Sequence, residues 1–184
     1  MFEAIQNFDA GALLSIQENL RVPFLDGFMT FMTRLGDSGF IWILLGLLLL
    51  IPKKTRRSAA DVFLCLALAF ILNDLILKPL IARARPFETI DGLTILITAP
   101  GSFSFPSGHT NASFAAAFAL TRAFGKKGAL AYIPAILIAF SRCYVGVHYP
   151  TDVFAGMTVG TLAAVIACWL SRRYIKSDLF KKTE

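Results

Sequence analysis

The sequence predicts an all-α helix bundle embedded in a membrane, and three observations support this fold class. Of the 184 residues, 56% are apolar and only 16% are charged, whereas soluble domains are about 45–50% apolar and about 25% charged. The mean hydropathy is +0.65. Several runs also approach the roughly 20 apolar residues that a helix needs to cross a bilayer. The length suits one domain, 1–184.

Five apolar runs are candidates for membrane crossings. Four of them are long enough, or nearly so: 58–77, 107–124, 128–147 and 153–170. The fifth, 39–51, has only 13 residues, so it must extend towards the N-terminus or sit among thicker neighbours. We therefore expect five transmembrane helices, with a sixth left open by the N-terminal segment. Within 153–170, Gly156 and Gly160 form a pair that favours close helix packing.

Residues 1–36 precede these runs and are expected to form short amphipathic helices. The predicted breaks lie at Gly11, Pro23 and Gly36. Asp26 and Arg34 make 24–35 a poor lipid-spanning segment. We expect this part of the chain to lie at the membrane interface or to be tucked against the bundle.

Basic residues mark the ends of the runs that face the cytoplasm, because short cytoplasmic loops are rich in Lys and Arg. Three clusters lie at the C-terminal ends of the runs 39–51, 107–124 and 153–170, respectively: Lys53, Lys54, Arg56 and Arg57; Arg122, Lys126 and Lys127; and Arg172, Arg173 and Lys176. Alternating crossings place all three on one face. The sequence therefore predicts a multi-pass protein of the cell membrane with its N-terminus outside.

Unusual polar residues gather at the opposite, extracytoplasmic ends of three runs. They are Lys78, Arg83 and Arg85; Ser107, Gly108 and His109; and Arg142, His148 and Asp152. Both histidines of the chain belong to this set. Each charge at mid-bilayer costs about 2.5–3.5 kcal/mol on insertion scales, so charged residues in or beside spans invite a functional explanation.

This set has the chemistry of a phosphate site. Several guanidinium and ammonium groups without a majority of carboxylates favour an anion with several oxygens. Free N–H groups at a helix start near Gly108 would add to that preference. Asp152 could hold the Nδ1 proton of His148, leaving Nε2 free to attack phosphorus. His109 could then protonate the departing oxygen.

Each residue alone also has a simpler interpretation. Lys78 and Arg85 could be interfacial anchors, and Asp74 could simply pair with Lys78. Arg83 could do no more than face lipid headgroups, and Asp152 could only cap a helix. These interpretations leave unexplained why nine polar residues converge from three helices.

No cofactor is predicted. Cys65, Cys143 and Cys168 are odd in number and lie inside apolar runs, so a disulfide framework or a zinc site is not expected. We interpret them as small buried apolar residues. The polar set also lacks the carboxylate cluster that a magnesium site would need.

The spacing resembles the three-part signature of the type 2 phosphatidic acid phosphatase superfamily. The blocks are Lys78-x6-Arg85-Pro86, then Pro106-Ser107-Gly108-His109, then Ser141-Arg142-x5-His148-x3-Asp152. They span 78–152, and the order and offsets match without departure. The resemblance implies a membrane-embedded phosphatase that works without a metal. Members usually have six membrane helices, so a sixth helix in this chain would have to come from the N-terminal segment.

The resemblance also implies a role for each matching residue. His148 would be the nucleophile that forms a phosphohistidine, Asp152 its partner and His109 the general acid. The phosphoryl oxygens would be bound by Lys78, Arg85, Ser107, Gly108 and Arg142.

The expected function is hydrolysis of a lipid phosphate or diphosphate at the extracytoplasmic face. By family analogy the favoured substrate is undecaprenyl diphosphate, a by-product of cell-wall synthesis, which would yield undecaprenyl phosphate. Phosphatidylglycerophosphate and phosphatidate remain alternatives. The expected partners are the lipid substrate and the bilayer, with no nucleic acid; the oligomeric state is left open. From another class, a lipid-phosphate transporter or a non-catalytic lipid-binding scaffold would also carry cationic groups.

Overall fold

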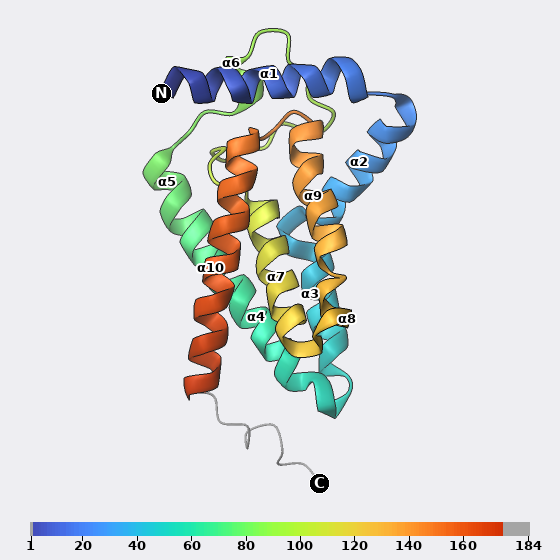
Figure 1. Ribbon diagram of the computed structural model, residues 1–184, viewed down its shortest axis with the longest axis vertical. Coiled ribbons are helices and arrows are strands. Elements are labelled where there is room, and N and C mark those ends of the chain that lie inside the picture. The colour runs from blue at the N-terminus through green and yellow to red at the C-terminus, as the bar shows by residue number, and fades with distance from the viewer. Residues whose placement is uncertain (1, 175–184) are drawn as a thin grey trace.

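Helix α1 (Phe2–Leu20) lies across one end of a bundle whose long helices run side by side (Figure 1). The computed structural model describes residues 2–174, in which all regular structure is helical. The other α-helices are α2 (Pro23–Leu35), α3 (Phe40–Leu50), α4 (Arg56–Phe70), α5 (Lys78–Ile81), α6 (Pro86–Thr89), α7 (Gly108–Phe124), α8 (Lys126–Ala129), α9 (Tyr132–Tyr144) and α10 (Pro150–Tyr174). Tighter 3₁₀ turns at Asp37–Gly39 and Lys53–Thr55, and a π-helical segment at Ile71–Leu77, connect some of them.

The first helix is longer than the sequence predicts. It continues through Gly11, so the predicted break there is wrong. A single glycine lowers helix propensity by only about 1 kcal/mol, which the flanking residues offset. Leu13 is buried beneath the helix, whereas Phe8 on its outer side is 60% exposed. This amphipathic helix at the end of the bundle agrees with the interfacial position expected for the start of the chain.

Helix α2 enters the bundle instead of lying at the interface. Pro23 starts the helix, which packs beside α9 (Figure 1). At Gly36 the chain bends by 50° and continues through the 3₁₀ turn Asp37–Gly39 into α3. For 24–35 the tucked alternative therefore holds. The bent pair also supplies the additional length that the short run 39–51 lacks.

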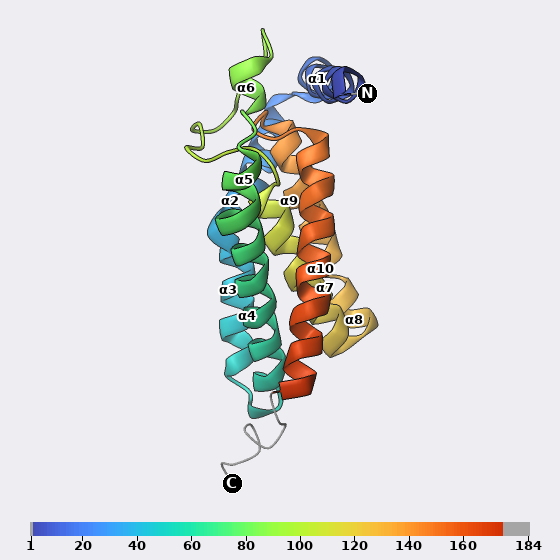
Figure 2. The same ribbon diagram turned by 90° about the vertical axis from the view of Figure 1, so that its left-hand side faces the viewer.

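The number of crossings stays a prediction. Among the described residues, the stretch Lys53–Thr89 and α10 are long and apolar enough to cross a membrane, and the bent pair of α2 and α3 could be a third span. Helices α7 and α9 are shorter, with 17 and 13 residues. Figure 2 shows both running along the same bundle as α4 and α10.

Small residues let the central helix α7 approach its neighbours closely. Its alanines, including Ala115 and Ala119, are buried in the core shared with α4 and α10. A Cβ atom added to Gly160 of α10 would lie 2.2 Å from the carbonyl oxygen of Asn111 in α7. The predicted close packing at Gly160 is thus confirmed. Because this contact fixes the end of α7 relative to the start of α10, it also places the residues described below.

The three cysteines are buried and free, as expected for small apolar residues. Pro134 falls in the first turn of α9, because the run 128–147 is divided into α8 and α9.

The ends of α4, α7 and α10 that carry the basic clusters lie at the end of the bundle opposite α1 (Figures 1 and 2). Lys176, which was counted in the last cluster, lies outside the described residues.

The long connection before α7 is held beneath α1. Leu93 is buried and packs with Leu13 and Tyr149. Arg21, at the end of α1, donates hydrogen bonds to the carbonyl oxygens of Thr94 and Tyr144, both at 2.9 Å. These contacts fix the connection between α1 and the turn that follows α9.

Candidate active site

The three signature blocks meet at one cavity near the α1 end of the bundle. The cavity has a volume of about 520 Å³. Six of the eight predicted site residues line it: Lys78, Arg85, Gly108, His109, Arg142 and His148. The helices supply them from their ends: the junction of the π-helical segment with α5, the first turn of α7, the last turn of α9 and the turn before α10. The structure therefore brings both imidazoles to the same cavity.

The other two predicted residues, Asp152 and Ser107, support the cavity from behind. Asp152 is fully buried in the first turn of α10, two residues beyond its start, so it is not the N-cap residue. The Ser107 N–H donates to the carbonyl oxygen of Asp152 at 3.1 Å. Its hydroxyl oxygen accepts a hydrogen bond from Thr110 at 3.0 Å. Ser107 precedes the first residue of α7, as the predicted helix start requires.

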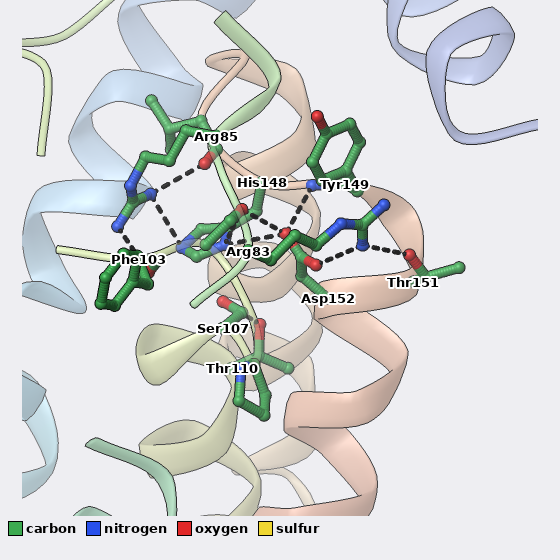
Figure 3. Close-up of polar contacts among 12 residues, drawn as sticks. Arg83, Arg85, Phe103, Ser107, Thr110, His148, Tyr149, Thr151 and Asp152 are labelled. Atoms are coloured by element: carbon green, nitrogen blue, oxygen red, sulfur yellow. Dashed lines mark hydrogen bonds and ion pairs between the residues drawn. The ribbon is translucent and has the colours of Figure 1, made fainter. Parts of the chain in front are cut away.

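The hydrogen bonds of His148 define its tautomer (Figure 3). Arg85 Nη1 lies 3.3 Å from Nε2 of His148. Because a guanidinium can only donate, Nε2 must be the unprotonated nitrogen and the proton must sit on Nδ1. Nδ1 faces Oδ2 of Asp152 at 3.4 Å. The nitrogen with a free electron pair is thus the one on the Arg85 side of the ring.

Burial keeps His148 neutral. The side chain is 2% exposed and stands in the turn between α9 and α10. Burial lowers the pKa of His148 to about 3; the hydrogen bond to Asp152 opposes this shift, while Arg142 and Arg85 reinforce it. At neutral pH the ring is therefore a neutral base with an available lone pair, as a nucleophile requires.

Asp152 is held by donors on several sides. Its Oδ2 accepts hydrogen bonds from the Ser104 hydroxyl at 2.5 Å and from the Tyr149 N–H at 3.0 Å. Ser104 is fully buried and also lies 3.5 Å from Nδ1 of His148. Sequence analysis missed Ser104 because it stands outside the spaced blocks. It nevertheless fixes the carboxylate that faces the imidazole.

Arg83 is an internal bridge, so the interpretation that it only faces lipid headgroups is wrong (Figure 3). It donates to Oδ1 of Asp152 at 2.6 Å and to Oδ2 of Asp9 at 2.8 Å. Its guanidinium carbon also lies 3.7 Å from the ring centre of Tyr149, in cation–π contact. The fully buried Asp9 accepts a second hydrogen bond from the N–H of Thr151 at 3.1 Å. Helix α1 is thereby joined to the partner of His148.

Two guanidinium groups present donors in fixed positions. Arg85 is held by the carbonyl oxygens of Ser102 at 2.7 Å and Val147 at 2.8 Å. Arg142 is 2% exposed and donates to the hydroxyl of Thr33. Its Nε is buried and has no hydrogen-bond partner among the described residues. Such an unsatisfied buried donor is costly unless a ligand oxygen completes it.

Lys78 and Gly108 complete the polar wall. Lys78 pairs with Asp74 one turn earlier at 2.6 Å, as the spacing allowed. A Cβ atom on Gly108 would lie 3.3 Å from the Lys78 amine and 3.2 Å from Asp74. Glycine therefore lets the start of α7 approach this pair, where free N–H groups favour an anion.

The opposite imidazole, that of His109, has a partner that sequence analysis missed. Its Nε2 lies 2.9 Å from Oδ1 of Asp37, in the bend between α2 and α3. The remaining cavity wall is apolar and includes Ile43, Phe63, Leu66 and Phe70. Within residues 2–174, no three His, Cys, Asp or Glu side chains are grouped as a metal site would require.

The chain is similar to known proteins in sequence and in fold. The model of the PAP2 superfamily matches residues 58–176. An undecaprenyl-diphosphatase of Sulfolobus acidocaldarius is 34% identical over 142 residues, covering 77% of this chain and 68% of that protein. The crystal structure of Aquifex aeolicus LpxE has a TM-score of 0.75 at 30% identity, over 85% of this chain and 93% of the other. That of a PAP2-type phosphatidylglycerolphosphate phosphatase from Bacillus subtilis has a TM-score of 0.74 at 29% identity, over 95% and 89%.

Proposed function

Because this chain belongs to the PAP2 superfamily and is a membrane lipid phosphatase, we propose that it hydrolyses its substrate through a phosphohistidine on His148. The observation that carries the proposal is the tautomer of His148. Nε2 is unprotonated and lies beside Arg85, while Nδ1 faces Asp152. A phosphoryl group bound to the cationic wall would meet this lone pair.

The reaction has two steps. In the first, Nε2 forms a bond to phosphorus while the bond from phosphorus to the leaving oxygen breaks, and His109 gives that oxygen a proton. The Nδ1 proton of His148 stays on the ring, where Asp152 stabilises the positive charge. In the second, His109 takes a proton from water as the water oxygen attacks phosphorus. The P–N bond breaks, and inorganic phosphate leaves.

The cations supply the electrostatic part of catalysis. Negative charge builds up on the equatorial oxygens in phosphoryl transfer, and donors aimed at those oxygens lower the barrier. Arg85, Arg142 and Lys78 line the cavity, and the first two are already fixed by protein contacts. We propose that these residues, with Ser107 and the Gly108 amide, bind the phosphoryl group. They would do so without a metal, so activity should persist in EDTA.

The proposed substrate is undecaprenyl diphosphate, hydrolysed at the outer face of the cell membrane. The similar protein from Sulfolobus acidocaldarius is named an undecaprenyl-diphosphatase, and the apolar wall of the cavity suits a lipid tail. Phosphatidylglycerophosphate is the alternative, since the similar crystal structure from Bacillus subtilis is of a phosphatase for that lipid. Phosphatidate is the third lipid to compare.

The test uses purified protein in detergent with the three lipids labelled with ³²P on the terminal phosphate. We expect the highest kcat/KM with undecaprenyl diphosphate and transient labelling of the protein in an acid-labile, base-stable form. His148→Ala should abolish both turnover and labelling. Asp91→Asn, in an exposed loop position, is the matched control and should keep both. Turnover by the His148→Ala variant would overturn the proposed mechanism, and a different preferred lipid would overturn only the substrate.

A further inference from the structure

The bend between α2 and α3 is built for close approach to His109. A Cβ atom on Gly36 would lie 2.8 Å from Cδ2 of His109 and 2.7 Å from Ile138. After it, Ser38 has a φ of 52° and Gly39 a φ of 71°. The left-handed region is unfavourable for serine, and such backbone is found where the surroundings enforce it, often at functional sites. The helix break therefore needs an explanation beyond connecting two helices.

The bend places a carboxylate beside the His109 ring. Oδ1 of Asp37 lies 2.9 Å from Nε2 of His109. The Asp37 side chain is 62% exposed, whereas that of His109 is 17% exposed. The carboxylate thus keeps much of its hydration and stays ionised at little cost, while the imidazole that it contacts is enclosed. In this geometry Asp37 can accept a hydrogen bond from a protonated Nε2 of His109.

The other charges around His109 are mostly positive. The charged and titratable groups that face it from neighbouring elements are Asp37 from the bend, Asp74 and Lys78 from the π-helical segment and α5, Arg85 before α6, Arg142 from α9 and His148 before α10. Asp74 is already paired with Lys78 at 2.6 Å. The cations that bind a phosphate would also disfavour a protonated imidazole, since like charges repel. Asp37 is the carboxylate in direct contact with His109.

We propose that Asp37 is a positioning residue for the leaving-group acid, holding the His109 imidazole by its Nε2–H and favouring its protonated form against the effects of burial and of the cationic wall. The proton available to the leaving oxygen is then the one on Nδ1. This inference rests on the proposed function. Asp37 would orient the acid His109 in the same way that Asp152 is proposed to orient the nucleophile His148. The glycines and the left-handed Ser38 are then the local means of bringing that carboxylate to the ring.

The sharpest test varies the leaving group. A poor alkoxide leaving group needs a proton in the transition state, whereas p-nitrophenolate leaves with little help. We expect Asp37→Asn to lower kcat/KM for phosphatidate by about 10²-fold, at the low end of the 10²–10⁴ that a general acid contributes. The same variant should lose no more than about threefold with p-nitrophenyl phosphate. His109→Gln should show the same selective pattern, and the double variant should be no worse than His109→Gln alone.

A second readout does not depend on turnover. Because the chain has only two histidines, ¹⁵N-histidine labelling of the full-length protein gives two imidazole signals, which His148→Ala assigns. In Asp37→Asn the His109 ring should lose its proton at a lower pH than in the wild type, while the His148 signal stays unchanged. Asp91→Asn is the matched control and should alter neither the spectra nor the rates.

The outcomes separate this inference from the function on which it rests. Equal losses with both substrates, or an unchanged His109 titration, would show that Asp37 acts only on folding or on phosphate binding, and would overturn the inference. Full activity of Asp37→Asn on phosphatidate would do the same. A wild-type protein that hydrolyses none of undecaprenyl diphosphate, phosphatidate and p-nitrophenyl phosphate would overturn the proposed function, and this inference with it.

Discussion

At the scale of single residues, His148 combines two properties that usually conflict: it lies beside cations, and in the proposed mechanism it must attack a phosphate as a neutral base. Burial resolves the conflict, because a neutral ring with a pKa of about 3 keeps its lone pair across the physiological range. The contact with Arg85 then selects which nitrogen carries that lone pair. Burial and the contact with Arg85 therefore decide whether this imidazole can act as a nucleophile, and through which nitrogen.

The lowered pKa predicts how His148 responds to acid. An ordinary histidine becomes protonated near pH 6.5, but His148 should remain a neutral Nδ1–H tautomer at pH 5. Rates alone cannot show this, because a phosphate monoester takes up a proton near pH 6. The measurement is the ¹⁵N shift of the imidazole from pH 8 to pH 5 in the ligand-free protein. A midpoint at or above pH 6 for His148 would contradict the tautomer assigned above.

Asp152 and Ser104 should matter to different degrees. Asp152→Asn removes the charge that would stabilise the imidazolium in the transition state and should lower kcat by about 10⁴-fold, as the same change of the orienting carboxylate does in a Ser-His-Asp triad. Ser104→Ala removes one of several donors to the same carboxylate and should cost about tenfold. Steady-state rates with undecaprenyl diphosphate measure both, with KM expected to change little. A Ser104→Ala variant as slow as Asp152→Asn would show that the hydroxyl has a direct chemical role.

At the scale of elements, Arg83 joins α1 to the proposed active site. The side chains of Asp9 and Asp152 are both 0% exposed, and each accepts a hydrogen bond from this guanidinium. Removing one partner of a buried ion pair leaves a charge without compensation. A helix that lies across the bundle thereby influences the carboxylate that orients the nucleophile.

Loss of Arg83 should therefore destabilise the fold as well as slow the reaction. Arg83→Met is expected to lower the free energy of unfolding by about 3 kcal/mol, seen as a lower Tm in detergent. Adding Asp9→Asn should recover part of that loss, because one of the two uncompensated carboxylates is removed. Lys54→Met, at an exposed basic position at the opposite end, is the control and should leave Tm unchanged. If the double variant were less stable than Arg83→Met, the ion pair would not be the cause.

The contact between α7 and α10 makes a second prediction for the elements. Gly160→Ala would force a methyl group against the backbone of Asn111 and should destabilise the protein by about 3 kcal/mol, as overpacking does. Gly11→Ala is the matched control, since nothing lies within 4 Å of its added Cβ. That change should raise stability slightly, by about 0.5–1 kcal/mol. Thermal unfolding of both variants in the same detergent compares them, and equal stability would contradict the tight helix contact.

At the scale of the whole molecule, the polar cavity and the basic clusters occupy opposite ends. This arrangement predicts an active site outside the cytoplasm if the basic clusters face inward. In intact cells, Asp91→Cys should react with a membrane-impermeant maleimide, and Lys54→Cys should react only after permeabilisation. The three natural cysteines are buried, so the unmodified protein serves as the background. The reverse labelling pattern would place the catalytic end in the cytoplasm.

The cavity residues were predictable because each lies at a fixed offset within 78–152. Short-range pairs such as Asp74 with Lys78 follow directly from helix geometry. The meeting of the blocks followed from hydropathy and charge, since alternating crossings bring the same ends of three runs to one side. The five-crossing count has not been tested in the same way. The N-terminal segment, where length and charge gave no clear answer, is where the predicted breaks were partly wrong.

The supporting residues could not be predicted, because they meet only after folding. Asp9 and Arg83 are 74 positions apart, and Asp37 and His109 are 72 apart. Nothing in the local sequence shows that α1 turns flat across the bundle or that the chain bends at Gly36. These contacts depend on how whole helices dock. A motif can therefore identify the reacting groups without revealing what orients them.

The unpartnered Nε of Arg142 has a consequence for how the enzyme behaves in its surroundings. No described protein atom accepts a hydrogen bond from this buried donor, so a tetrahedral oxyanion of suitable size that entered the pocket would satisfy it. The inorganic phosphate released at each turnover is such an ion, and so is phosphate in the medium. Turnover should accordingly slow as the concentration of inorganic phosphate rises, with phosphate acting as a competitive inhibitor.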